Sequence, residues 1–139
     1  MSKSAPELTP QQLGEIAKTF GTPVYIYNAD RIAIQYKKLQ TAFKDCNARF
    51  FYACKALTNI NVLKYMHSLG ANLDCVSINE VLLGLKAGFE PKNILFTPNC
   101  VDFDEYITAK DLGVNINIDN ISILEQFGNR FGNTYPVCI

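Results

Sequence analysis

Short apolar segments, rich in β-branched and aromatic residues, recur along this chain at intervals of about twenty residues. That interval accommodates one strand, one helix and two short loops. The five segments occupy residues 50–53, 73–76, 94–97, 114–118 and 135–139. Strands that alternate with helices at a constant spacing pair in parallel through right-handed crossovers. The repeat therefore predicts an α/β fold.

The segments between these runs have the spacing of amphipathic helices. Their two clearest apolar faces consist of Val62, Leu63, Met66 and Leu69, and of Val81, Leu82, Leu85 and Phe89. The expected helix starts are Asn59, Ser77 and Asp102, and the expected helix ends are Gly70, Gly88 and Gly113. Ser77 and Glu80 have the spacing of a capping box.

Two architectures fit such a repeat, a doubly wound sheet and a (β/α)₈ barrel. A barrel typically needs about 250 residues, and this chain reaches only its fifth strand. A dinucleotide-binding sheet would carry G-x-G-x-x-G after its first strand, whereas residues 52–56 contain no glycine. Other doubly wound sheets lack that motif, so both architectures stay open on spacing alone.

Residues 21–28 form an apolar segment that does not fit the repeat. The sequence predicts a short strand there that belongs to a different sheet, followed by a helix from about residue 29 to residue 43. This lead-in segment precedes the repeating part of the chain.

Composition limits the classes of partner. The chain has 139 residues, 48% of them hydrophobic, which suffices for one buried core. Its 13 basic and 13 acidic residues balance, so we expect no nucleic-acid partner. Residues 1–12 lack the apolar run of a signal peptide, and no run is long enough for a membrane span. The five cysteines share no C-x-x-C spacing, so we expect a cytoplasmic protein with neither disulfides nor a metal site.

Lys55 ends an otherwise apolar strand, residues 50–55. Side chains alternate along a strand, so Phe51, Ala53 and Lys55 should share one face. In a barrel, that lysine would project from the carboxyl end of the strands, where such barrels have their active sites. Partial burial would favour the neutral amine that Schiff-base chemistry requires. The alternative is a lysine that extends from a strand end into solvent.

Around Lys55 the sequence resembles the fold-type III pyridoxal-phosphate (PLP) decarboxylases. Residues 52–56, Tyr-Ala-Cys-Lys-Ala, resemble the family's Y-A-x-K-A motif, in which the lysine bonds the cofactor. Residues 22–27 resemble its T-P-x-Y-x-Y/F lead-in strand, and residues 74–80 its D-x-x-S-x-x-E segment. Residues 87–89 and 94–96 match its A-G-F and I-x-F elements. Within this group the chain is most similar to the diaminopimelate decarboxylases.

The resemblance implies a PLP-binding (β/α)₈ TIM-type barrel, of which residues 29–139 would hold about the first five βα units. Residues 1–28 would be a lead-in segment whose strand pairs with a C-terminal β-domain. Lys55 would bond pyridoxal 5'-phosphate, and Asp74 and Glu80 would line the cofactor pocket. Asp74 and Glu80 also have structural explanations, as a strand-end hydrogen-bond partner and a capping-box residue. His67, the single histidine, is interpreted as a helix-surface or core-edge residue.

The implied reaction is the decarboxylation of meso-2,6-diaminopimelate to L-lysine and CO₂, by an enzyme that forms a homodimer and binds a small amino-acid substrate. Alternatives within the fold are ornithine, arginine and carboxynorspermidine decarboxylases. Alternatives outside catalysis are a non-catalytic PLP-binding or regulatory relative, and a plain doubly wound binding domain with a surface Lys55. Five strands of eight cannot close a barrel, so we expect this chain to be part of a longer enzyme and inactive alone.

Overall fold

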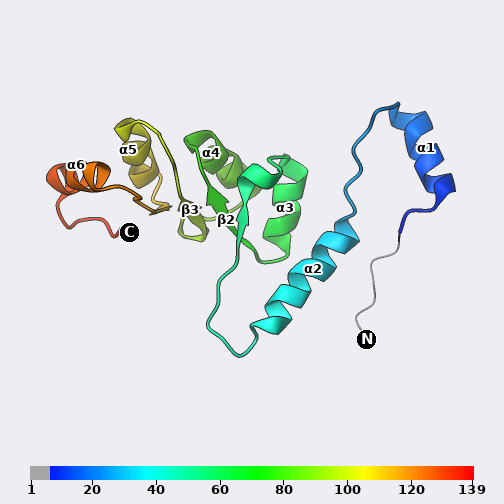
Figure 1. Ribbon diagram of the computed structural model, residues 1–139, viewed down its shortest axis with the longest axis horizontal. Coiled ribbons are helices and arrows are strands. Elements are labelled where there is room, and N and C mark those ends of the chain that lie inside the picture. Colours follow the sequence, from blue (N-terminus) through cyan, green and yellow to red (C-terminus); the bar gives the residue numbers. More distant parts are fainter. Residues whose placement is uncertain (1–6) are drawn as a thin grey trace. The chain divides into compact units, whose positions relative to one another are not determined.

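The computed structural model describes residues 7–139 (Figure 1). The chain divides into two compact units, the first ending at Ala48 and the second spanning Arg49–Ile139. Among the described residues, none of the helices has the length and apolar character that crossing a membrane would require.

The first unit contains two helices, α1 (Pro10–Phe20) and α2 (Ala29–Ala42). Helix α2 confirms the predicted helix. Helix α1 was not predicted, although its start signals are visible in the sequence. Thr9 and Gln12 form a reciprocal capping box, and Pro10 occupies the first turn, where its missing N–H costs no hydrogen bond.

Residues 21–28, between the two helices, do not form the predicted lead-in strand. The segment is largely exposed, with Tyr25 at 88% and Tyr27 at 55% of full exposure. A strand is defined by its pairing with a neighbour, and within residues 7–139 no strand pairs with this segment. Its pairing with a C-terminal β-domain stays a prediction.

The second unit is built on a parallel four-stranded sheet, as the repeat predicts. Its strands lie in the order β1-β2-β3-β4, and every pairing is parallel. The strands are β1 (Phe51–Ala53), β2 (Asn72–Cys75), β3 (Ile94–Phe96) and β4 (Asn115–Ile116). Sequential order is typical of a barrel, because a doubly wound sheet reverses its order at a switch point. The strand order therefore favours the barrel.

The predicted fifth strand, residues 135–139, is reduced to one parallel bridge between Asn117 and Cys138. The Cys138 N–H donates to the Ile116 carbonyl, and the Ile118 N–H donates to the Cys138 carbonyl. Pro136 has no N–H to contribute, which limits the ladder on this side. The segment thus lies beside β4 in the expected direction, but the strand predicted there is wrong in extent.

Four helices connect and cover these strands. They are α3 (Ile60–Ser68), α4 (Ile78–Ala87), α5 (Phe103–Asp111) and α6 (Ile121–Phe131). Each packs against the next in sequence, and α4 also packs on β2 and β3 (Figure 1). Short 3₁₀ turns, Cys54–Ala56 and Pro91–Asn93, complete the connections.

Burial alternates along the strands and separates the two faces of the sheet. Leu73 and Cys75 are fully buried, whereas the alternate residues Asn72 and Asp74 are only partly buried. The covered face is continued by Ile94, Phe96 and Ile116. In a (β/α)₈ barrel the helices cover the outer face, so the face that carries Asp74 corresponds to the barrel interior.

The predicted boundaries of the helices are confirmed. Asn59, Ser77 and Asp102 are the N-caps of α3, α4 and α5. Gly70, Gly88 and Gly113 have positive φ angles of 82°, 106° and 74°. The left-handed backbone explains glycine there, because a Cβ would be strained.

The predicted apolar face of α4 is partly wrong. Leu82 is 48% exposed, whereas Gly84 is buried against Leu73. Helix and sheet approach so closely at Gly84 that a Cβ added there would overlap the side chain of Leu73. A pattern search that scores only large apolar residues cannot recognise glycine as the contact residue.

Candidate active site at the carboxyl ends of the strands

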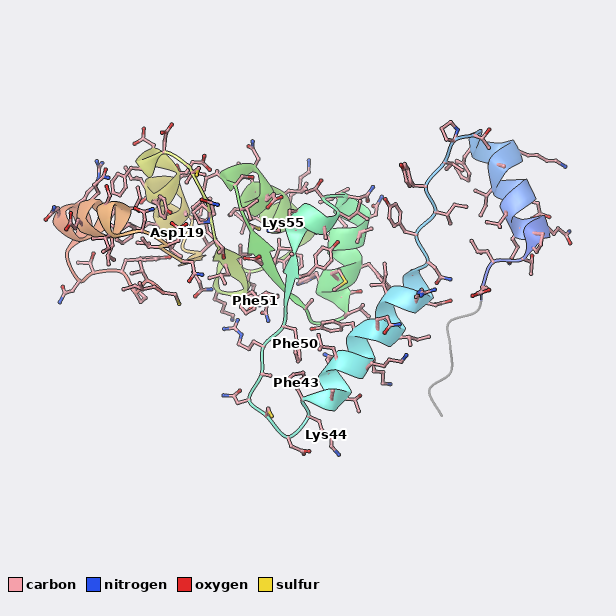
Figure 2. The ribbon with its side chains drawn as sticks, in the orientation of Figure 1. Phe43, Lys44, Phe50, Phe51, Lys55 and Asp119 are labelled. Carbon is pink, nitrogen blue, oxygen red and sulfur yellow. The ribbon has the colours of Figure 1, made fainter. Side chains whose placement is uncertain are left out.

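Lys55 lies directly beyond the carboxyl end of β1, in the 3₁₀ turn Cys54–Ala56 (Figure 2). The prediction that Lys55 belongs to the strand is wrong, because β1 ends at Ala53. The expected partial burial is wrong as well, since Lys55 is exposed. The turn is closed by the Leu57 N–H, which donates to the Cys54 carbonyl at 3.1 Å. Cys54 is completely buried, so it anchors the turn while Lys55 stays accessible.

Asp74 lies on the neighbouring strand, on the face of the sheet that helices leave uncovered. It pairs in register with Ala53 of β1 and Leu95 of β3. The Thr97 hydroxyl donates a hydrogen bond to Asp74 Oδ1 at 2.7 Å. The carboxylate therefore joins the ends of β2 and β3 beside the turn that carries Lys55. Its cofactor role stays a prediction.

Glu80 occupies the first turn of α4 and folds back over the end of β2. The Val76 N–H donates to Glu80 Oε2 at 2.8 Å, and the Glu80 N–H donates to the Ser77 hydroxyl at 3.3 Å. Only half of the predicted capping box therefore forms, because the carboxylate takes the Val76 N–H in place of the Ser77 N–H. Glu80 holds the loop after β2, and its cofactor role also stays a prediction.

A third carboxylate stabilises the same loop. Glu105, in the first turn of α5, accepts a hydrogen bond from the Ile78 N–H at 3.1 Å. The start of α4 is thus tied to both β2 and α5. Glu105 could not be recognised from the sequence, because nothing in its spacing links it to residue 78.

Two buried thiols lie beneath Glu80, and the sequence analysis did not bring them together. Cys54 and Cys75 occupy equivalent positions at the ends of β1 and β2, one βα repeat apart. Burial raises the pKa of the Cys54 thiol to about 11, with a further contribution from the Glu80 carboxylate. Burial, followed by the neighbouring Cys54 and Glu80, raises the pKa of Cys75 as well. Both thiols are therefore protonated at neutral pH.

His67 lies in the last turn of α3, at the end of the unit opposite Lys55. The side chain is exposed and packs edge-on against Phe89, with ring centroids 5.0 Å apart. This placement confirms the interpretation of His67 as a helix-surface residue.

The residues at the carboxyl ends of the strands provide a group that can bond an aldehyde cofactor. Lys55 provides an exposed primary amine next to the uncovered face of the sheet, which is the group that bonds an aldehyde. The loops around it are fixed by the carboxylate hydrogen bonds of Asp74, Glu80 and Glu105. An accessible amine on a rigid support is what covalent attachment of such a cofactor needs.

Residues 29–137 match the family described as pyridoxal-dependent decarboxylase, pyridoxal binding domain. The chain belongs to this family, and its fold is the N-terminal part of the decarboxylase barrel domain.

The individual relatives include several decarboxylases. The diaminopimelate decarboxylase of Methanothermobacter thermautotrophicus is 44% identical over 112 residues, which cover 79% of this chain and 26% of that protein. The structure is similar to diaminopimelate decarboxylase from Helicobacter pylori complexed with L-lysine, with a TM-score of 0.77 and 30% identity over 86% of this chain and 32% of that one. It is also similar to lysine/ornithine decarboxylase from Vibrio vulnificus complexed with putrescine, with a TM-score of 0.79 and 25% identity over 89% of this chain and 35% of that one. The chain thus spans between 26% and 35% of the length of these relatives.

Proposed function

We propose that this chain supplies the cofactor-bonding lysine of a PLP-dependent diaminopimelate decarboxylase, with Lys55 in that role. The observation that carries the proposal is the exposed amine of Lys55 at the carboxyl end of the first strand, within a motif that resembles the family's lysine motif. The 44% identity to a diaminopimelate decarboxylase supports the choice of substrate. The complete enzyme would convert meso-2,6-diaminopimelate to L-lysine and CO₂ as a homodimer.

When bound, PLP would supply the electron sink for loss of CO₂. The residues of this chain would have three roles. The Lys55 amine would hold the cofactor, and its Nζ atom would hold or deliver a proton. Asp74, fixed by Thr97, presents a carboxylate on the inner face of the sheet. Glu80 and Glu105 keep the loop after β2 in one conformation.

The similarity to a lysine/ornithine decarboxylase supports a second candidate, decarboxylation of a basic amino acid without a second carboxylate. The test is product analysis of the longer enzyme that contains this chain, incubated separately with meso-diaminopimelate, ornithine, lysine and arginine. Lysine formed from meso-diaminopimelate supports the first proposal. Putrescine formed from ornithine, or cadaverine formed from lysine, with no lysine formed from meso-diaminopimelate, would favour the second.

The cofactor role of Lys55 is tested on the chain itself. Incubation with PLP followed by borohydride should leave a stable adduct whose mass and position are found by mass spectrometry. We expect the adduct on Lys55, and we expect Lys55→Ala to abolish it. The matched control is Lys64→Ala, because Lys64 is an exposed lysine on α3 and should leave the adduct unchanged. An adduct spread equally over several exposed lysines would contradict the proposal.

A further inference from the structure

The two buried thiols and the Glu80 carboxylate form a compact donor cluster. Cys54 Sγ, Cys75 Sγ and a carboxylate oxygen of Glu80 all lie within 4.8 Å of one another. Cys54 and Cys75 have no exposed surface, and Glu80 is half-buried above them. Two buried cysteines alone would be ordinary small core residues. The Glu80 carboxylate adds a third donor of a type that metal ions use, within reach of both sulfurs.

We propose that Cys54, Cys75 and Glu80 form a binding site for a soft divalent cation of the Zn²⁺ or Cd²⁺ type. Thiolate sulfur selects such ions, and a carboxylate oxygen is a common third ligand. Two sulfurs and one oxygen would leave a fourth position for water, the arrangement of an open tetrahedral site. The proposed site does not use the Lys55 amine, although Cys54 adjoins Lys55 in the same turn, and its test does not depend on the proposed decarboxylase function.

The distances allow such a site with little movement. In tetrahedral coordination the donors stand about 3.6–3.8 Å apart, given bond lengths of about 2.3 Å for sulfur and about 2.1 Å for oxygen. Side-chain shifts of about 1 Å would therefore bring the three donors into range. The loop also orients the third ligand, because the Val76 N–H donates to Glu80 Oε2 at 2.8 Å. Outer hydrogen bonds of this kind typically fix metal-binding side chains.

A cation at this site would bind the two cysteines as thiolates, because the thiolate and not the thiol is the metal ligand. Both side chains would lose their protons on binding. Binding should therefore release protons and weaken as the pH falls.

The experiment uses the 139-residue chain and Cd²⁺ under reducing conditions. The background variant carries Cys46→Ser, Cys100→Ser and Cys138→Ser, which removes the three exposed cysteines and leaves only Cys54 and Cys75. We expect it to bind one Cd²⁺ ion with the ultraviolet absorption of cadmium–thiolate bonds. We also expect about two protons released per ion, measured with a pH indicator.

Single changes in this background separate the ligands. Cys75→Ala should remove most of the cadmium–thiolate absorption, and Glu80→Gln should weaken binding by about tenfold or more. Absence of the absorption in the background variant, or release of no protons, would overturn the proposal. So would unchanged affinity in Cys75→Ala. The absorption and proton count of the background variant remain decisive if Cys75→Ala fails to fold by circular dichroism.

Discussion

At Gly84, α4 and β2 approach so closely that a single added carbon decides whether they fit. A Cβ at this position would overlap the side chain of Leu73 and approach Ile94 Cδ1 to 3.4 Å. Both neighbours are fully buried core residues, so neither can move into solvent. The contact between α4 and β2 at this point therefore depends on a residue without a side chain.

We expect Gly84→Ala to lower the free energy of unfolding by about 1–3 kcal/mol, because overpacking forces shifts in a dense core. The measurement is urea denaturation followed by circular dichroism. Gly128→Ala is the matched control, since Gly128 lies in α6 with no atom near its added Cβ. Gly128→Ala should leave the free energy of unfolding unchanged, or raise it by up to about 1 kcal/mol, because alanine has the higher helix propensity. Equal effects of the two substitutions would contradict the close contact.

The buried thiol of Cys54 predicts a loss of stability in alkali. Burial raises its pKa in the folded chain to about 11, above that of an unfolded thiol. The resulting stabilisation is complete at neutral pH and is lost as the pH rises toward about 11, because the unfolded chain ionises first. Cys54→Ala should therefore flatten the alkaline decline in the free energy of unfolding. Cys100→Ala, at an exposed cysteine, should leave the decline as it is.

At the scale of the elements, N-caps position the helices that surround the site. The side chain of Asn120 accepts a hydrogen bond from the Ile123 N–H at 2.9 Å and begins α6. Asp102 occupies the same position in α5 but makes no side-chain capping bond. The two caps thus differ in one hydrogen bond, which makes them a natural comparison.

Asn120→Ala should reduce the free energy of unfolding by about 1 kcal/mol, the usual value of a capping hydrogen bond. Asp102→Ala should cost less, because it removes only the favourable charge at the helix start. Thermal unfolding of both variants provides the measurement. A larger loss of unfolding free energy from Asp102→Ala than from Asn120→Ala would contradict this difference between the two caps.

At the scale of the whole molecule, four parallel strands expose one face of the sheet and cannot close a barrel. The chain also spans only 26% to 35% of the decarboxylases to which it is similar. These two facts limit what the 139 residues should do unaided.

We therefore expect the 139-residue chain to form the PLP adduct at Lys55 but to release no measurable CO₂ from meso-diaminopimelate. The physical reason is that an amine suffices for cofactor attachment, whereas decarboxylation needs groups around the whole cofactor. Release of labelled CO₂ is the measurement, with a complete diaminopimelate decarboxylase as the positive control. Turnover by the 139-residue chain near that of the complete enzyme would refute this expectation.

The sequence by itself predicted the parts of this protein that depend on local pattern. The βα repeat predicted five parallel strands, of which four form. The glycines at 70, 88 and 113 predicted the helix ends, and residues 52–56 identified Lys55 as the candidate. Such features succeed because helix periodicity, strand periodicity and backbone conformation are set mainly by neighbouring residues.

Only the tertiary structure decided the rest. In the structure, Lys55 lies in a turn after the strand, and the Glu80 carboxylate accepts the hydrogen bond of the Val76 N–H. Gly84 of α4, rather than Leu82, contacts the core. The tertiary structure also brought Cys54 and Cys75 together from neighbouring repeats. These outcomes depend on distances between elements far apart in the chain, and the pattern within one element carries no information about such distances.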